Sequence, residues 1–396
     1  MSTEYISICE SVTAAHPDKL CDRISDEIVD RLLEQDPASR VVAETAMFGG
    51  VVFLATRIAT TARIDLSEIA RRVLSGAGYE RDDYDGEGAS ILTSSLGTLP
   101  ESYPAVHAEG LDETGISAIP AGNLVTVFGF SARETETLMP LPVVLAHALA
   151  RGLEQAARSG ALPYLMPDGK TQVALVYRDG RPSRIHSISL AVCRRPGVAV
   201  PERQVRDDLI QSVVEPVFAE RELCPDNDTH YAFNPEGPFV GGGPQVHCGL
   251  TGRKTAVDCY GGLARHGGAA LSGKDPLRID RVGAYAARWV AKQVVAAGLA
   301  ERCELQLSYV AGEAHPLSIQ VDCFNTGRIP DTEIEAWIRR RFDLRPAAIV
   351  RDLGLQSFAA RPGGFYRHLA AYGHMGREDL DAPWERLDRV SDLEGD

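Results

Sequence analysis

One order of apolar patterns occurs three times along this chain of 396 residues: strand, helix, strand, strand, helix. Apolar residues three and four positions apart predict the helices, and short apolar runs bounded by turn residues predict the strands. Each unit predicts a split βαβ sheet with helices on one face, so the expected fold class is α+β with three pseudo-symmetric domains. The expected strands are 5–9, 40–47, 51–59, 124–131, 171–177, 184–193, 254–258, 304–310 and 317–324, and the expected helices lie around 24–33, 66–74, 141–157, 205–217, 280–299 and 332–342.

The length of the chain also indicates two or three domains rather than one. We place these domains at residues 1–101, 120–240 and 241–396. The stretch from Gly97 to Ile119 contains prolines and glycines without a clear period, and the linker proper is expected at 102–119. A mobile loop or lid and a disordered linker are both consistent with this composition.

The formal net charge of −14 argues against a nucleic-acid or anionic-membrane partner, because both attract basic surfaces. The chain has no run of eighteen apolar residues, and residues 1–10 lack the pattern of a signal peptide. We therefore expect a soluble, cytoplasmic protein. Its eight cysteines include no Cys-x-x-Cys pair, which argues against a zinc site or a disulfide framework. An anionic substrate has to be bound by a local cluster of cations.

Lysine is rare in this chain, since only five of the 41 basic residues are lysines. A chain that uses arginine for most of its cations retains lysine where a compact ammonium is needed, as on a phosphate chain; the alternative is chance. An aspartate beside such a lysine is consistent with a Mg²⁺ site, because protein-bound Mg²⁺ usually has only one or two carboxylate ligands. Lys292 lies in an ordinary helical pattern, and the other four lysines lie in the short polar stretches 16–20, 167–171, 250–257 and 271–276.

Three local motifs point to a phosphate-binding site. His16-Pro17-Asp18-Lys19 opens the first long helix, where free N–H groups favour an anion; a helix cap with a structural histidine is the alternative. Arg253 and Lys254 place two cations at the start of a predicted strand. The glycine-rich stretch 260–276 lets backbone approach a ligand closely, unless it is only a structural loop. The chain has neither a Walker loop nor a Rossmann fingerprint.

In this order, the motifs closely resemble those of the S-adenosylmethionine synthetases (methionine adenosyltransferases). The resemblance implies three pseudo-symmetric α+β domains, a homodimer with active sites between subunits or a homotetramer, and two Mg²⁺ and a K⁺. It also implies that a methionine sulfur attacks C5′ of ATP and expels the triphosphate, which is then cleaved to diphosphate and phosphate. The matching stretches run nearly end to end: 10–12, 16–19, 162–163, 167–170, 233–235, 249–254, 260–276 and 371–374.

The resemblance also implies roles for matching positions. His16 is expected to stabilise charge on the departing O5′. Displacement at C5′ requires no covalent enzyme intermediate, so positioning and electrostatics are expected to supply most of the rate. The resemblance also implies that the triphosphate is bound by Lys170, Arg253, Lys254 and Lys274, with Arg265 and His266 nearby. It implies that Phe239 stacks on adenine and that Asp168 lies near the ribose. It assigns Asp18 and Asp280 to Mg²⁺ and Glu44 to K⁺.

The methionine-binding part of the chain departs from the family pattern. Arg57 stands where the family usually has a glutamate for the substrate ammonium, His247 where it has an aspartate, and Asn123 where it has another acid. Arg278 stands where a lysine usually meets the substrate carboxylate, a change that the arginine-rich composition explains. The glutamine expected in the lid falls near residues 98–99.

Arg57 and a protonated His247 would repel an ammonium, and like-charge juxtaposition costs several kcal/mol. The sequence therefore predicts poor binding of methionine and better binding of a thioether acid that lacks the α-amino group. Three alternatives stay open: an ordinary S-adenosylmethionine synthetase for L-methionine, ATP chemistry with water or phosphate as acceptor, and a catalytically silent nucleotide-binding partner. The complete set of lysines, aspartates and His16 argues against the silent partner.

Overall fold

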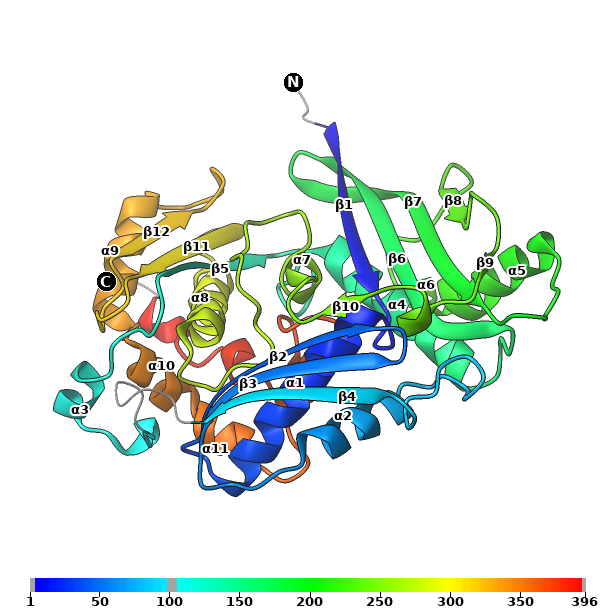
Figure 1. Ribbon diagram of the computed structural model, residues 1–396. Helices are drawn as coiled ribbons and strands as arrows, with labels where there is room; N and C mark the ends of the chain where they lie inside the picture. Colours follow the sequence, from blue (N-terminus) through cyan, green and yellow to red (C-terminus); the bar gives the residue numbers. More distant parts are fainter. Residues whose placement is uncertain (1–3, 98–104, 394–396) are drawn as a thin grey trace.

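The computed structural model describes residues 4–97 and 105–393. Figure 1 shows three sheets with helices packed against them, which confirms the α+β class. Most predicted strands and helices are present within a few residues of their expected limits. Within the described ranges, no helix is long and apolar enough to cross a membrane.

The first sheet has the strand order β10-β2-β3-β4. β2 (Arg40–Phe48) pairs antiparallel with β3 (Val51–Ala59), and β4 (Ser90–Gly97) lies parallel to β3. Alternate residues of β2 and β3 are buried, and α1 (Pro17–Gln35) and α2 (Leu66–Ser75) pack on this sheet. The apolar pattern does not predict β4, because serines and a threonine interrupt it. The other face of the sheet exposes Phe48, Val51, Phe53, Leu92 and Leu96.

The second sheet has the order β1-β6-β7-β8, with β9 paired to β7, and α4 packs against it. The third sheet has the order β12-β11-β5, and α8 packs against it. The strands are β1 (Glu4–Val12), β5 (Val125–Ala132), β6 (Leu165–Arg178), β7 (Arg181–Arg194), β8 (His230–Phe233), β9 (Phe239–Val240), β10 (Gly249–Leu250), β11 (Arg302–Tyr309) and β12 (Ser318–Asp322). The helices are α3 (Glu113–Ser117), α4 (Leu141–Arg158), α5 (Glu202–Leu209), α6 (Glu215–Phe218), α7 (Thr255–Asp258), α8 (Ile279–Ala296), α9 (Asp331–Arg341), α10 (Pro346–Leu353), α11 (Leu355–Ala359) and α12 (Tyr366–Leu369).

The first strand of each repeat lies in the sheet of another repeat. β1 pairs with β6 in the second sheet, β5 pairs with β11 in the third, and β10 pairs with β2 in the first. The predicted strand at 254–258 is wrong, because these residues form the short helix α7 with its N-cap residue, and the strand of this repeat is the earlier β10. Gly252, at φ +79°, turns the chain between the two elements. This exchange of strands brings three distant parts of the chain together. The limits of the three domains remain predictions.

The described part of the expected linker, residues 105–119, is folded against the C-terminal region. A 3₁₀ turn at Ala108–Gly110 and α3 both contact α10. Ala108 and Ile116 are fully buried, and the Ala108 backbone N–H donates to the Gln356 side chain at 2.7 Å. The expected lid position at 98–99 lies outside the described residues. Mobility of the segment 102–119 therefore remains a prediction.

Helix α8 is buried on all sides, so its cations lie in the core with carboxylate partners. Arg281 pairs with Asp26, and Lys292 pairs with Glu385 at 2.9 Å. Arg281 also donates to the Lys274 carbonyl at 2.9 Å. This core contact holds the loop that carries one of the predicted site lysines.

Candidate active site

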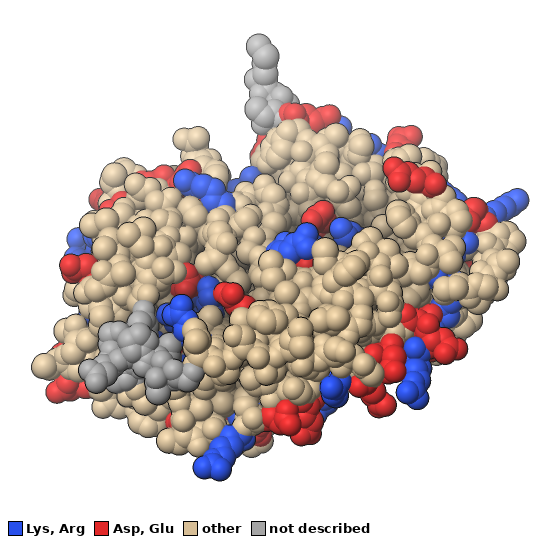
Figure 2. All heavy atoms as spheres, in the orientation of Figure 1, with Lys and Arg blue, Asp and Glu red and all other residues tan. Residues whose placement is uncertain are grey.

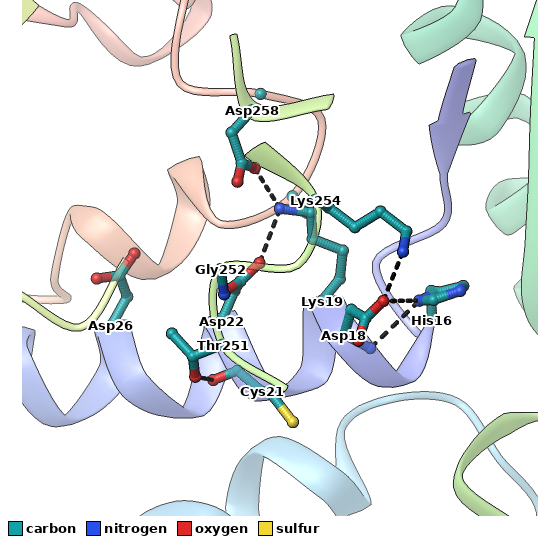
Figure 3. Close-up of polar contacts among 12 residues, drawn as sticks. His16, Asp18, Lys19, Cys21, Asp22, Asp26, Thr251, Gly252, Lys254 and Asp258 are labelled. Carbon is teal, nitrogen blue, oxygen red and sulfur yellow. Dashed lines mark hydrogen bonds and ion pairs between the residues drawn. The ribbon is translucent and has the colours of Figure 1, made fainter. Parts of the chain in front are cut away.

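The start of α1 carries the first cluster of predicted site residues. His16 is the N-cap residue, and its Nδ1 accepts a hydrogen bond from the Asp18 backbone N–H at 3.2 Å. The nearly buried Asp18 carboxylate accepts from Lys254 Nζ at 2.5 Å (Figure 3) and from the Leu250 N–H at 3.0 Å. Arg253 lies 3.6 Å from the same carboxylate. We call His16, Asp18, Lys170, Arg253 and Lys254 the His16 group.

The electrostatics of the His16 group favour a neutral histidine beside an ionised aspartate. Burial lowers the pKa of His16 to about 3, and the Lys254 ammonium contributes to the shift. Because Nδ1 accepts a hydrogen bond, the proton of the neutral imidazole lies on Nε2, from which it can be donated to a ligand oxygen. Burial opposes ionisation of Asp18, but the Lys254 hydrogen bond keeps the pKa of this carboxyl below its usual value.

Lys19, the last residue of the His16 tetrapeptide, has a structural role. Its side chain is fully buried and bonds Asp22 at 2.9 Å and also Asp258 (Figure 3). Burial alone would lower the pKa of Lys19, but the two carboxylates raise it. The compact ammonium at this stretch therefore serves an internal ion pair, which joins α1 to α7 close to Lys254.

Strand β6 carries Asp168 and Lys170 beside the end of β1, which leads into α1, and β9 carries the residue expected on adenine. Lys170 stands opposite Val12 in the β1–β6 pairing, and its charge contributes to the low pKa of His16. Asp168 is buried, which raises its pKa to about 6. Phe239 begins β9 and is 45% exposed, so its ring is available to a ligand.

Two backbone N–H groups complete this part of the site, and no side-chain motif predicts them. The Leu250 N–H holds Asp18, as described above, and the Gly243 N–H donates to Asp168 at 3.0 Å. Gly243 has φ +65°, and a Cβ at this position would collide with the Tyr79 ring. The run of three glycines at 241–243 is the sequence signal that could have indicated the close approach.

The second cluster of predicted site residues lines a cavity of about 320 Å³ beside the start of α8, which we call the Asp280 cavity. Asp280 is nearly buried and accepts from the Asn123 amide at 2.8 Å, while Lys274 Nζ lies 3.4 Å from its other oxygen. Burial lowers the pKa of Lys274, and Asp280 opposes this shift. The predicted residues that line the cavity are Glu44, Arg57, Asn123, Lys274, Arg278 and Asp280.

Arg57 reaches the Asp280 cavity from the exposed face of β3. It stands between Val42 of β2 and Leu96 of β4, and both neighbours also line the cavity. Among the described residues, Arg57 has no ion-pair partner within 4 Å. His247 does not line this cavity; it is exposed, and its charge acts on Asp168. Within one chain, Arg57 and His247 therefore belong to different clusters.

The His16 group and the Asp280 cavity share no residue. In the central part of the face shown in Figure 2, charged atoms gather at two places, and further charged atoms lie along the margins. The structure does not bring Arg265 or His266 to either cluster. Arg265 bonds Glu304 at 2.6 Å and lies over the Phe128 ring, and His266 is exposed. A triphosphate contact by these two residues remains a prediction.

Comparison with known families agrees with this fold. Three family models match consecutive parts of the chain: S-adenosylmethionine synthetase, N-terminal domain at residues 4–96, central domain at 118–239, and C-terminal domain at 241–386. The protein is thus an ATP-binding transferase of the α+β class. More particularly, the chain belongs to the S-adenosylmethionine synthetase family.

Curated relatives match over nearly the full chain. An S-adenosylmethionine synthase of Trichormus variabilis is 46% identical, with 99% of this chain and 97% of the relative covered. An S-adenosylmethionine synthase of Thermosynechococcus vestitus is 45% identical, with 98% and 97% covered. The protein is an enzyme of this class, an ATP-dependent adenosyltransferase, in a family that generally uses Mg²⁺ and K⁺.

Proposed function

We propose that the protein transfers the adenosyl group of ATP to the sulfur of a thioether carboxylic acid. The C–S bond forms as the C5′–O5′ bond breaks, and the electron pair of the broken bond stays on the triphosphate. The observation that carries this proposal is the buried His16 at the start of α1, whose Nδ1 accepts the Asp18 N–H while Lys254 bonds the adjacent Asp18 carboxylate. Its Nε2–H can donate to O5′ while negative charge develops there.

The remaining cations fit the triphosphate. Lys170, Arg253 and Lys254 belong to the His16 group, and Lys274 lies in the Asp280 cavity. Ammonium and guanidinium groups form charge-assisted hydrogen bonds with phosphate oxygens, which strengthen as the leaving group gains charge. Hydrolysis of the released triphosphate to diphosphate and phosphate is part of the proposal.

Asp18 and Asp280 fit Mg²⁺ that is bound to phosphate. Each is a nearly buried carboxylate close to a lysine. No three His, Cys, Asp or Glu side chains in the described parts of the chain form a metal-binding group, so phosphate and water oxygens would supply the other ligands. Glu44, exposed at the Asp280 cavity, would bind K⁺. Bound cations neutralise charge on the triphosphate.

We further propose that the acceptor lacks the α-amino group. Arg57 and Arg278 line the Asp280 cavity, and of its two carboxylates Asp280 already binds Lys274 and Asn123. Two guanidinium groups favour a carboxylate and disfavour an ammonium. An oxo acid or a simple thioether acid therefore fits this charge distribution better than an amino acid.

L-Methionine is the second candidate acceptor. The curated relatives are named S-adenosylmethionine synthases, and Glu44 is an exposed carboxylate in the same cavity that can pair with an ammonium where it does not bind K⁺. If the attraction of Glu44 for the ammonium exceeds the repulsion by Arg57, the enzyme is an ordinary S-adenosylmethionine synthetase.

A comparison of acceptors in separate reactions distinguishes the two candidates. Purified protein with ATP, Mg²⁺ and K⁺ receives L-methionine, 4-methylthio-2-oxobutanoate or 3-methylthiopropionate, and adenosyl products are identified by mass. We expect higher kcat/KM for the two deaminated acids. Arg57→Glu should shift preference toward methionine, and the double variant Arg57→Glu with His247→Asp should shift it further if His247 of a second subunit faces the same ligand; the single changes need not add. Arg63→Glu reverses the charge of an exposed arginine outside the cavity and is the matched control.

Two outcomes contradict different parts of the proposal. Efficient use of L-methionine, with no change in preference in the double variant, would contradict the altered acceptor and leave an ordinary S-adenosylmethionine synthetase. Absence of an adenosyl product from every acceptor would contradict the adenosyl transfer to these acids.

A further inference from the structure

A second cavity, of about 580 Å³, lies between α1, α2, α4 and the segment that follows α12. It shares no residue with the His16 group or the Asp280 cavity. We call it the Arg23 cavity. Its lining contains more cations than carboxylates: Arg23, Arg72, Arg151, Arg367 and Arg377 against Glu27, Glu154 and Asp379.

The carboxylates of the Arg23 cavity are already occupied by other partners. Each one accepts hydrogen bonds or ion pairs from at least two groups. Glu27 binds Arg31 and Arg367, Glu154 binds Arg158 and the Tyr372 hydroxyl, and Asp379 binds Arg377 and lies 3.6 Å from Arg151.

Arg23 forms no ion pair with any of these carboxylates. Among the described residues its one hydrogen-bond partner is the Ala14 carbonyl, at 3.2 Å, and no carboxylate lies within ion-pair distance. Burial lowers the pKa of Arg23, and the Glu154 carboxylate opposes this shift. Burial also lowers the pKa of Arg151, and the neighbouring Arg377 adds to that shift. Arg23 has no carboxylate of the described chain within ion-pair distance, and Arg151 shares Asp379 with Arg377, so the five arginines and three carboxylates of the lining leave a surplus of positive charge that an anion would offset.

We propose that the Arg23 cavity binds a small molecule that carries a phosphate group. The planar donors of arginine bind phosphate oxygens in pairs. The volume falls within the range of small-molecule sites, roughly 300–1,000 Å³, so the cavity has room for an organic part as well as the anion. Val73, Leu380 and the Tyr372 ring provide apolar surface for that part.

Arg23 and Tyr372 also hold the backbone of Ala14, which leads into the turn before His16. Arg23 donates to the Ala14 carbonyl, and the Ala14 N–H donates to the Tyr372 hydroxyl at 3.4 Å. Ala14 precedes His16 by two residues. A ligand that engages Arg23 or Tyr372 changes how this turn is held, so occupancy of the Arg23 cavity is linked to nucleotide binding at the His16 group. Such linkage is reciprocal.

The binding test keeps the nucleotide site filled. Protein saturated with Mg²⁺ and a non-hydrolysable ATP analogue is titrated by calorimetry with inorganic phosphate in one series and glycerol 3-phosphate in another. We expect saturable binding of glycerol 3-phosphate at one site per chain. Arg23→Gln and Arg151→Gln should each weaken it about tenfold or more, because each removes a charge-assisted hydrogen bond. Arg203→Gln, at an exposed arginine on α5, is the matched control and should bind as the wild type does.

The two probes separate the possible sources of the phosphate group. Binding of glycerol 3-phosphate alone supports a phosphate ester, and equal binding of both probes supports recognition of the anion itself. No saturable binding of either probe, or equal binding in folded Arg23→Gln and Arg151→Gln proteins, overturns the site. An affinity for the ATP analogue that glycerol 3-phosphate leaves unchanged overturns the link to His16. These readouts do not depend on the identity of the sulfur acceptor.

Discussion

Single residues of the same type have different roles here, and burial decides which role each has. Lys19 and Lys254 both bind an aspartate, but Lys19 is fully buried between two carboxylates, whereas Lys254 is partly exposed beside one. A buried and fully paired lysine stabilises the fold, and a partly exposed lysine can exchange its partner for a ligand.

Replacement of the three lysines assigned to triphosphate should lower turnover by orders of magnitude. Lys170→Ala, Lys254→Ala and Lys274→Ala each remove a charge-assisted contact to the leaving group. Steady-state kinetics with ATP as the varied substrate measures the loss, and circular dichroism checks that the variants are folded. Wild-type turnover in any one of them would remove that lysine from the site.

Replacement of the two aspartates should raise the Mg²⁺ concentration needed for half-maximal activity. Asp18→Asn and Asp280→Asn keep the shape of the side chain and remove its charge, which weakens a hard-cation ligand. The readout is a Mg²⁺ titration of activity at fixed ATP. Asp226→Asn, at a carboxylate of the loop before β8, should leave the titration unchanged. Titration curves that coincide with wild type would contradict the metal assignment.

At the scale of elements, the ion pair of Lys19 with Asp22 and Asp258 joins α1 to α7. These two helices carry or flank the predicted phosphate ligands, so their relative position sets the geometry of the His16 group. Burial raises the pKa of Asp22 to about 7, and Lys19 opposes that shift. The Lys19 ammonium therefore favours the ionised form of the buried Asp22 carboxylate.

Removal of Lys19 should destabilise the protein. Lys19→Met keeps most of the side-chain volume and leaves Asp22 and Asp258 without their cation, which costs about 3–5 kcal/mol. The measurement is the urea-unfolding midpoint at pH 7.5. Arg72→Met removes an exposed i,i+4 ion pair on α2 and should cost less than about 1 kcal/mol. Equal midpoints for the two variants would show that the buried pair adds nothing to stability.

At the scale of the whole molecule, one chain carries its predicted site residues in two separate clusters. The exposed apolar face of the first sheet, which includes Phe53 and Leu92, continues directly to Arg57 and the Asp280 cavity. Large exposed apolar patches mark interaction surfaces. We propose that a twofold mate covers this face and that the His16 group of one chain completes the Asp280 cavity of the other.

Introducing charged side chains on this sheet face should therefore dissociate the oligomer and lower the activity together. Phe53→Asp with Leu92→Asp is expected to shift sedimentation from dimer or tetramer toward monomer at micromolar concentration and to lower turnover. Leu317→Asp, at a 74% exposed leucine outside this sheet, is the control and should change neither property. A strictly monomeric wild-type protein with full activity would contradict the shared site.

The sequence by itself determined the fold class and most of the repeated elements, and it singled out the His16 and Lys254 stretches, whose phosphate chemistry stays a prediction. These features depend on local patterns: helical periodicity, a cap residue and glycines beside cations. Tertiary structure alone decided which strands share a sheet, because the exchange of β1, β5 and β10 joins residues far apart in the chain. It also decided that Lys19 is internal and that Arg57 lines a cavity while His247 does not. Burial and long-range pairing set these outcomes, and neither has a local signal in the sequence.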